Sequence, residues 1–271
     1  MLPNNPYIEN AEKWINLAGI DYITQFVKAW ISFNAWYKNS YPNLESDSAA
    51  ISEIMNSPNI FRNRVEALLT GSGPEHLEFK AQVARLHQKL EDNQIYNRGA
   101  RISFTFVDFG HNPNSQGTII RYRCTFTVER GPIDPATGNR LDKNHILCSI
   151  QNSRGIVIFR HLQTNGHNIR ELMGLDSFQD LSLTQQNCLA EVYEKVHPRR
   201  TESLISDGQR YIEVGGLRLK DDVILLCQGI IALLYQLRNA LFHGQIIPNN
   251  ATTMVYEPAY HILYALIQNL R

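Results

Sequence analysis

The sequence lacks paired cysteines, an excess of charge of either sign and a secretory leader. Its four cysteines are scattered without a C-x-x-C pair, which argues against a disulfide framework or a zinc site and predicts buried free thiols in a reducing compartment. The formal net charge is zero, so the molecule as a whole has no strong attraction to nucleic acid or membranes. The first residues, MLPNNPYIENAEKW, contain neither the basic nor the apolar segment of a signal peptide. We therefore expect a cytoplasmic protein.

Familiar catalytic and cofactor-binding motifs are also missing. The sequence contains no G-x-S-x-G, H-E-x-x-H, P-loop or G-x-G-x-x-G pattern, which argues against the hydrolases, zinc proteases, nucleoside triphosphatases and dinucleotide-dependent enzymes built on them. His161 and His167 lack companions at the spacing of metal ligands. We therefore expect no metal and no cofactor, so that any catalysis uses the protein's own side chains.

The longest apolar run, VILLCQGIIALLYQLRNALFHG at residues 223–244, is expected to form a buried helix. Its apolar residues recur at helical spacing, and further apolar residues occupy the remaining faces. Gly244 follows the last periodic position and predicts the end of the helix. A membrane span needs about 20 mostly apolar residues, but Gln228, Gln236 and Arg238 interrupt this run. We therefore predict a helix of the core or of a subunit interface, without membrane contact.

The end of this helix carries Arg238, Asn239 and His243. A guanidinium presents a planar fork of donors to phosphate oxygens, and an imidazole exchanges a proton near neutral pH. Five residues of an α-helix turn by about 140°, so Arg238 and His243 share a cleft only if the arginine curls, the helix end loosens or two copies meet. The alternative is structural, in which Arg238 pairs with an acidic residue and His243 caps carbonyl groups.

The hexapeptide RNALFH at residues 238–243 resembles the R-X4-6-H motif of HEPN domains (higher eukaryotes and prokaryotes nucleotide-binding), in which a polar residue often follows the arginine. The segment WISFNAWY at residues 30–37 also resembles the first long helix of several HEPN proteins. The resemblance implies a metal-independent endoribonuclease. In the mechanism that the resemblance implies, His243 acts on the ribose 2′-hydroxyl or the leaving oxygen, and Arg238 binds the scissile phosphate. Asn239 orients these groups or adds a hydrogen bond.

The same resemblance implies partners. HEPN nucleases usually place two such motifs in one cleft of a homodimer, and many serve as toxins or antiviral effectors, some with a regulatory protein partner. One rival interpretation is a catalytically inactive HEPN-like module that binds RNA, a nucleotide or a protein. Another is the toxin of a pair with a minimal nucleotidyltransferase, in which a tyrosine lies two residues after the motif histidine. Gln245 occupies that position here, which argues against this second interpretation.

The order of periodicities predicts a mainly α fold with an inserted small antiparallel β-sheet, and the resemblance implies that the helices form a HEPN-like bundle. Residues 1–97 form the N-terminal helical part, residues 98–165 the inserted sheet, and residues 166–271 the C-terminal helical part with the motif. The predicted helices cover 11–41 with a break near 19–21, 58–69, 74–90, 182–196, 223–244 and 257–270. The predicted strands cover 102–107 and 120–128 as an antiparallel pair, 145–151, 156–161 and a hairpin at 211–219.

The middle of the chain is basic and offers a candidate RNA-binding surface. Residues 95–165 contain nine Lys/Arg and four Asp/Glu, a net charge of +9 − 4 = +5. Arg121 and Arg123 are predicted on the polar face of one strand, where cations can follow a phosphate backbone. The presence of Arg121 and Arg123 is explained equally well if this face of the sheet is exposed to solvent and binds no RNA. Asn34 lies within an aromatic segment. Either its side chain is hydrogen-bonded in the core or faces solvent, which gives it a structural role only, or it is a partner of the Arg238–His243 site.

Overall fold

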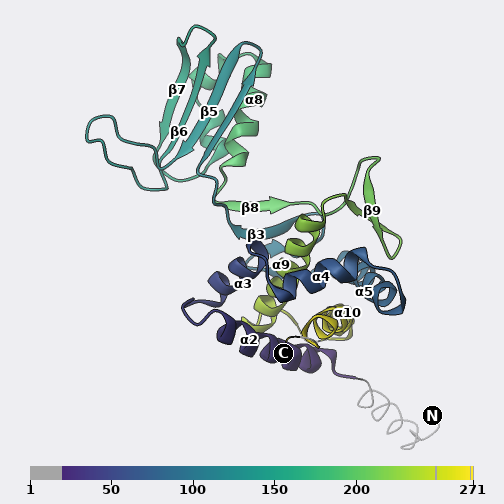
Figure 1. Cartoon of the computed structure of the whole chain (residues 1–271). Helices are drawn as coiled ribbons and strands as arrows, with labels where there is room; N and C mark the ends of the chain where they lie inside the picture. The colour runs from purple at the N-terminus through teal and green to yellow at the C-terminus, as the bar shows by residue number, and fades with distance from the viewer. Residues whose placement is uncertain (1–19, 248, 269, 271) are drawn as a thin grey trace, which may run out of the picture. The chain divides into compact units, whose positions relative to one another are not determined.

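A computed structural model describes residues 20–247, 249–268 and 270, and divides the chain into two compact units. Unit 1 comprises Met1–Asp108 and Glu202–Arg271, and unit 2 comprises Phe109–Thr201 (Figure 1). The mainly α prediction was wrong. The protein is about 48% helical and 21% strand, with several sheets including one of four strands, and is therefore mixed α/β. The sheet content was underestimated because several short strands show too little alternation to be recognised in the sequence.

Unit 1 is built from helices that enclose an aromatic core. Helix α10 packs on α2 and α5, whereas α9 packs on α3 and α4. Trp30, Tyr37 and Phe61 are among its largest fully or almost fully buried side chains. The helices are α2 (Tyr22–Ser40), α3 (Asp47–Asn56), α4 (Ile60–Thr70), α5 (Pro74–Asp92), α9 (Val223–Phe242) and α10 (Asn250–Ile267).

Capping side chains explain where these helices begin and where the sequence prediction differs from the structure. Asn59 caps α4, so this helix starts later than the Ser57–Pro58 pair suggested. Asn249 caps α10, which begins seven residues before the predicted 257 and accommodates Pro258 in its interior. Helix α3 was not predicted at all, although Ser46 caps it through the backbone N–H of Ala49. The predicted helical residues 11–19 lie outside the described part of the chain.

Short strands complete unit 1 and lead out of it. Strands β1 (Tyr96–Asn97) and β2 (Ala100–Arg101) form one hairpin. Strands β9 (Tyr211–Val214) and β10 (Leu217–Lys220) form the other, turning at Gly215–Gly216 as predicted. The chain passes between the units in β3 (Val107–His111) and β8 (Arg199–Glu202), which pair with each other. The predicted pairing of 102–107 with 120–128 was therefore wrong.

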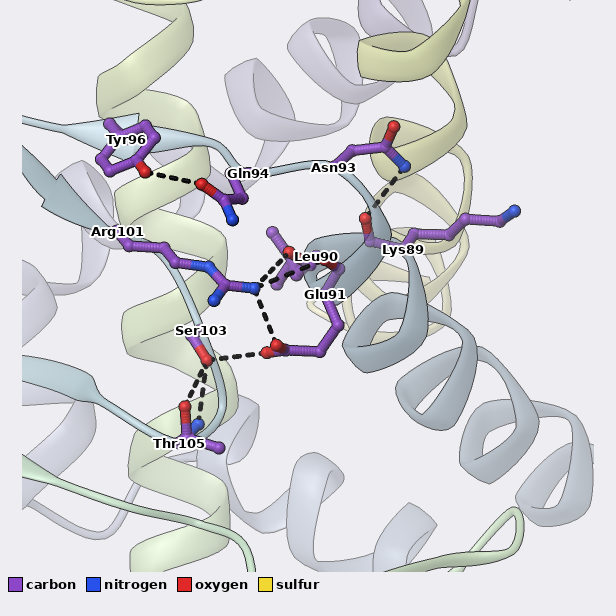
Figure 2. A network of polar contacts seen from close by, with 9 residues as sticks. All are labelled: Lys89, Leu90, Glu91, Asn93, Gln94, Tyr96, Arg101, Ser103 and Thr105. Carbon is purple, nitrogen blue, oxygen red and sulfur yellow. Dashed lines mark hydrogen bonds and ion pairs between the residues drawn. The ribbon is translucent and has the colours of Figure 1, made fainter.

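Figure 2 shows how the end of α5 is fastened to the segment after β2. The Glu91 carboxylate accepts from Arg101 Nη2 at 2.7 Å and from Ser103 Oγ at 2.9 Å, and Ser103 Oγ lies 2.7 Å from the Thr105 hydroxyl. In the same view the strand that carries Tyr96, β1, crosses the α9 ribbon, against which it packs. Because Glu91 neutralises Arg101, this network is best explained as a structural fastening that holds the hairpin near α9.

Unit 2 is a four-stranded antiparallel sheet with helices on one face (Figure 1). Phe126, Ile150 and Val192 belong to the core between the sheet and α8. The strands are β4 (Gln116–Arg121), β5 (Cys124–Arg130), β6 (Ile146–Asn152) and β7 (Val157–Gln163), in that order, and the helices are α6 (Ile169–Met173), α7 (Asp176–Gln179) and α8 (Leu183–Lys195). The four cysteines are buried and free, as predicted.

The β4–β5 connection differs from the single long strand predicted at 120–128. Tyr122 and Arg123 have φ angles of 52° and 60° and form a two-residue hairpin turn. Ile120 and Tyr122, predicted to be buried, are 76% and 71% exposed. Such turns usually contain glycine or asparagine, but here the alternating pattern continues through Tyr122 and Arg123, so the reversal could not be recognised from the residues.

A half-buried histidine in unit 2, His167, should make the protein less stable in mild acid. Burial lowers the pKa of His167, against the opposing effect of its 2.9 Å hydrogen bond to the Tyr193 carbonyl. As the pH falls below about 6.5, the unfolded state takes up this proton before the folded state, so stability is lost. The urea midpoint should fall between about pH 7.5 and about pH 5.5. His167→Gln, which keeps a donor, should show a smaller fall; an equal fall in both proteins contradicts the assignment.

Candidate functional site at the end of helix α9

Helix α9 is the core helix that the sequence predicts. Its N-terminus is capped by Asp222, whose side chain accepts from the Leu225 N–H at 3.0 Å, and 14 of its 20 residues are buried. By length and composition it also passes the test for a membrane span, with a mean hydropathy of 1.4, but 78% of that window is buried inside the protein. Gly244 ends the helix with φ 64°, and the Gln245 N–H bonds to the Ala240 carbonyl.

Arg238 is held in place by two oxygen acceptors. Its Nη2 donates to Asp47 Oδ2 at 3.0 Å and its Nη1 donates to Asn239 Oδ1 at 3.0 Å. The guanidinium also lies 4.7 Å from the centre of the Phe242 ring and 6.0 Å from that of Trp30. The structural alternative is therefore correct for Arg238 in one respect, since it pairs with an acidic residue. The side chain stays 18% exposed, so it is not sealed from solvent.

Asp47 is the member of the site that sequence reasoning missed. It is the first residue of α3, and its Oδ1 lies 3.2 Å from Lys38 Nζ, while its Oδ2 takes Arg238. One carboxylate thus serves two cations, leaving a local formal charge of +2 − 1 = +1. Burial first, and then the charge of Asp47, raises the pKa of the neighbouring Tyr37 hydroxyl well above its usual value. The Ser46–Asp47 pair before an apolar periodic segment was the signal available in the sequence.

His243 lies at the exposed C-terminal cap of α9. Its backbone N–H donates to the Asn239 carbonyl at 3.0 Å, whereas its imidazole makes no hydrogen bond or ion pair with the described residues. The predicted capping of carbonyls by this side chain is therefore not seen. Asn239, only 9% exposed, links the two motif residues through its side chain and its carbonyl. Arg238 turns toward α2 and α3, and the imidazole remains free at the helix end.

Asn34 lies on the same side of α2 as Trp30 and Tyr37, which border the site. Its side chain does not take part in the hydrogen bonds that Arg238, Asn239 and Asp47 make with one another. It is half-buried on α2, four residues after Trp30 and three before Tyr37, which places the three on one side of the helix. Within residues 20–247, 249–268 and 270, its side chain makes no hydrogen bond. Its assignment as a partner of the Arg238–His243 site remains a prediction.

Arg121 and Arg123 belong to unit 2 and do not form a stripe along one strand. Arg121 ends β4, and its Nη1 lies 2.7 Å from Glu191 Oε2, with half of its side chain exposed. Arg123 lies in the turn that follows. The predicted placement on a single polar strand face was therefore wrong, because the chain reverses between them. Whether they contact RNA stays a prediction.

Comparisons with known proteins add no further constraint. No protein-family model, no curated protein and no solved structure matches this chain. Among the residues that the structure describes, no group of three or more His, Cys, Asp or Glu side chains is placed to hold a metal ion. The functional proposal therefore depends on the residues at the end of α9 and on the resemblance of RNALFH to the HEPN motif.

Proposed function

We propose that the protein is a metal-independent endoribonuclease of the HEPN type, with His243 as the proton-transfer group and Arg238 as the phosphate-binding group. One observation supports this most. The exposed His243 imidazole, which has no hydrogen-bond or ion-pair partner among the described residues, lies at the end of a core helix and is joined through Asn239 to a guanidinium that is fixed in orientation. This combination supplies one general acid or base and an oriented cation, both of which phosphodiester transesterification uses.

The ion pair with Asp47 is compatible with phosphate binding by Arg238. Each terminal guanidinium nitrogen carries two N–H groups, and one on each is used, by Asp47 and by Asn239. The other two remain for a phosphate, provided that it approaches the exposed part of the side chain. The excess charge of +1 from Lys38, Arg238 and Asp47 favours a monoanionic phosphodiester at this place. In this proposal Asp47 is a positioning residue that holds the guanidinium fork.

The reaction follows from these groups. The 2′-hydroxyl loses its proton and its oxygen forms a bond to the adjacent phosphorus, while the bond from phosphorus to the 5′-oxygen breaks and that oxygen gains a proton. The products are a 2′,3′-cyclic phosphate and a free 5′-hydroxyl. In this scheme His243 donates the proton to the leaving oxygen, and the proton of the 2′-hydroxyl passes to a second general base.

A homodimer remains part of the proposal. The reaction has two proton-transfer steps, whereas one chain brings a single His243 to this helix end, so a second copy supplies the other group. The apolar faces of α9 do not support a dimer, because α3, α4, β1 and β10 of the same chain pack against them. The dimer depends on the two-proton argument and on the family resemblance. A toxin or antiviral role depends on that resemblance alone.

One observation favours the second candidate function, an inactive HEPN-like module that binds RNA, a nucleotide or a protein. Arg238 already has an acidic partner, which accounts for a partly buried charge without any catalytic role. The two candidates differ in one measurable property. The module binds its ligand without cutting it, and the nuclease leaves products with defined ends.

The expected chemistry is tested with purified protein and mixed RNAs in the presence of EDTA. RNA should be cut, and the upstream product should end in a 2′,3′-cyclic phosphate. The same RNA with a single 2′-deoxyribose at the cut site should survive, because it lacks the attacking oxygen. Cleavage of the deoxy-substituted strand, or an absolute need for a divalent metal, contradicts the mechanism even if the protein is a nuclease.

A further inference from the structure

The β1–β2 hairpin is fastened to the chain immediately after His243. The backbone N–H of Arg98, in the turn of this hairpin, donates to the side-chain Oε1 of Gln245 at 2.9 Å. Gln245 follows His243 by two residues, and strand β1 itself lies against α9. Residues far apart in the sequence thus meet at the end of α9 that carries the catalytic histidine of the proposed nuclease.

Arg98 is presented in an uncommon backbone conformation. Its φ angle is 52°, in the left-handed region that glycine and asparagine enter more readily than arginine. The hydrogen bond to Gln245 helps to hold this conformation. A left-handed backbone conformation costs free energy in a residue other than glycine, and such strained residues often lie at functional sites. The Arg98 side chain is exposed and pairs with no carboxylate in the described part of the chain. By contrast, Arg101 in the same hairpin is paired with Glu91.

A phosphate at the end of α9 needs additional positive charge. The C-terminus of a helix carries the negative end of its dipole and therefore repels an anion. Arg238 and Lys38 face Asp47, which removes part of their charge. Arg98 has no acidic partner among the described residues, and its backbone N–H is hydrogen-bonded to Gln245, two residues after His243.

We propose that Arg98 binds the phosphate next to the scissile phosphate of single-stranded RNA, with Gln245 as the residue that positions it. This inference rests on the proposed nuclease function, because it takes His243 as the point of cleavage. It extends the substrate-binding surface from α9 to the β1–β2 hairpin. It also explains why the position two residues after the histidine is a glutamine, whose amide oxygen is the acceptor for the Arg98 N–H.

The test is an RNA-binding measurement that does not depend on cleavage. A His243→Ala background prevents cutting, and a fluorescent single-stranded RNA of about 16 nucleotides is followed by anisotropy over a range of salt concentrations. Arg98→Ala should weaken binding about tenfold at low salt and reduce the salt slope by about 0.7, the value for one lost phosphate contact. Arg98→Lys should recover most of the salt slope, and Gln245→Leu should weaken binding less than Arg98→Ala.

Arg210→Ala provides the matched control. Arg210 is an exposed arginine of unit 1 just before β9, so its loss changes the net charge equally. Strand β10, the partner of β9, leads into the N-terminus of α9, and a helix of this length separates the two ends by about 30 Å. Binding by Arg210→Ala should match that of the His243→Ala parent. Equal affinity and salt slope in Arg98→Ala and Arg210→Ala overturn the inference.

Failure of this inference and failure of the nuclease proposal give different results. If His243 is needed for cleavage but Arg98→Ala binds like Arg210→Ala, only the hairpin role is wrong. If the wild-type chain binds RNA through Arg98 but never cuts it, the nuclease proposal is wrong and the hairpin remains an RNA contact. If the wild-type chain binds no RNA, both are overturned. Thermal unfolding of each variant checks that the fold is intact.

Discussion

Replacing His243 with alanine is expected to lower the rate of RNA cleavage by about 10² to 10⁴-fold, the usual contribution of a general acid or base. The fold should survive this change. The imidazole is exposed and makes no hydrogen bond with the described residues, while the helix end is held by backbone groups that alanine keeps. The measurement is single-turnover cleavage with enzyme in excess and EDTA present, beside a thermal unfolding curve for the same preparation.

His111→Ala is the matched control for this prediction. His111 is an exposed histidine at the end of β3 and lies in unit 2, outside the motif. It should cleave RNA at the wild-type rate. If His243→Ala cleaves as fast as the wild type, the activity belongs to a contaminating ribonuclease or to other residues, and the proposed role of His243 is wrong.

Arg238→Lys is expected to reduce cleavage by about 10²-fold, because lysine keeps the charge but loses the planar fork. A single ammonium cannot contact Asp47, Asn239 and two phosphate oxygens with the same geometry. The stacking on Phe242 is also weakened, since the 4.7 Å contact involves the flat guanidinium. The measurement is single-turnover cleavage at saturating enzyme, so that the chemical step is compared and not the affinity.

Asp47→Asn separates a positioning role from a purely structural pairing. This change removes the negative charge shared by Arg238 and Lys38 but leaves an oxygen acceptor for the guanidinium. It should lower the melting temperature, with a stability loss of about 1–3 kcal/mol, and reduce cleavage less than Arg238→Lys does.

The outcome for Arg238→Lys decides between the two functions. If Arg238→Lys lowers the melting temperature but cleaves at the wild-type rate, Arg238 is a structural residue and the binding-module interpretation is favoured.

The sequence alone determined the elements whose signals are local. Helix α9, its stop at Gly244 and the capped start of α8 follow from periodicity and from side chains three or four residues apart. The Gly215–Gly216 turn follows from the freedom of glycine at positive φ. The motif residues are placed by the same local rules, so their position at the end of a core helix was predictable, whereas the exposure of that end was not.

Only the tertiary structure decided which residues surround that helix end. Asp47 and Arg238 are 191 residues apart in sequence, and Arg98 and Gln245 are 147 apart, so no local period relates them. Their pairing follows from the packing of α3 and of strand β1 against α9, which side-chain shape and burial decide collectively. The same reason explains the wrong fold class. Strands β1, β2 and β8 contain only two to four residues, too few to show a period-two pattern in the sequence, and β8 is stabilised by β3, a partner distant in sequence.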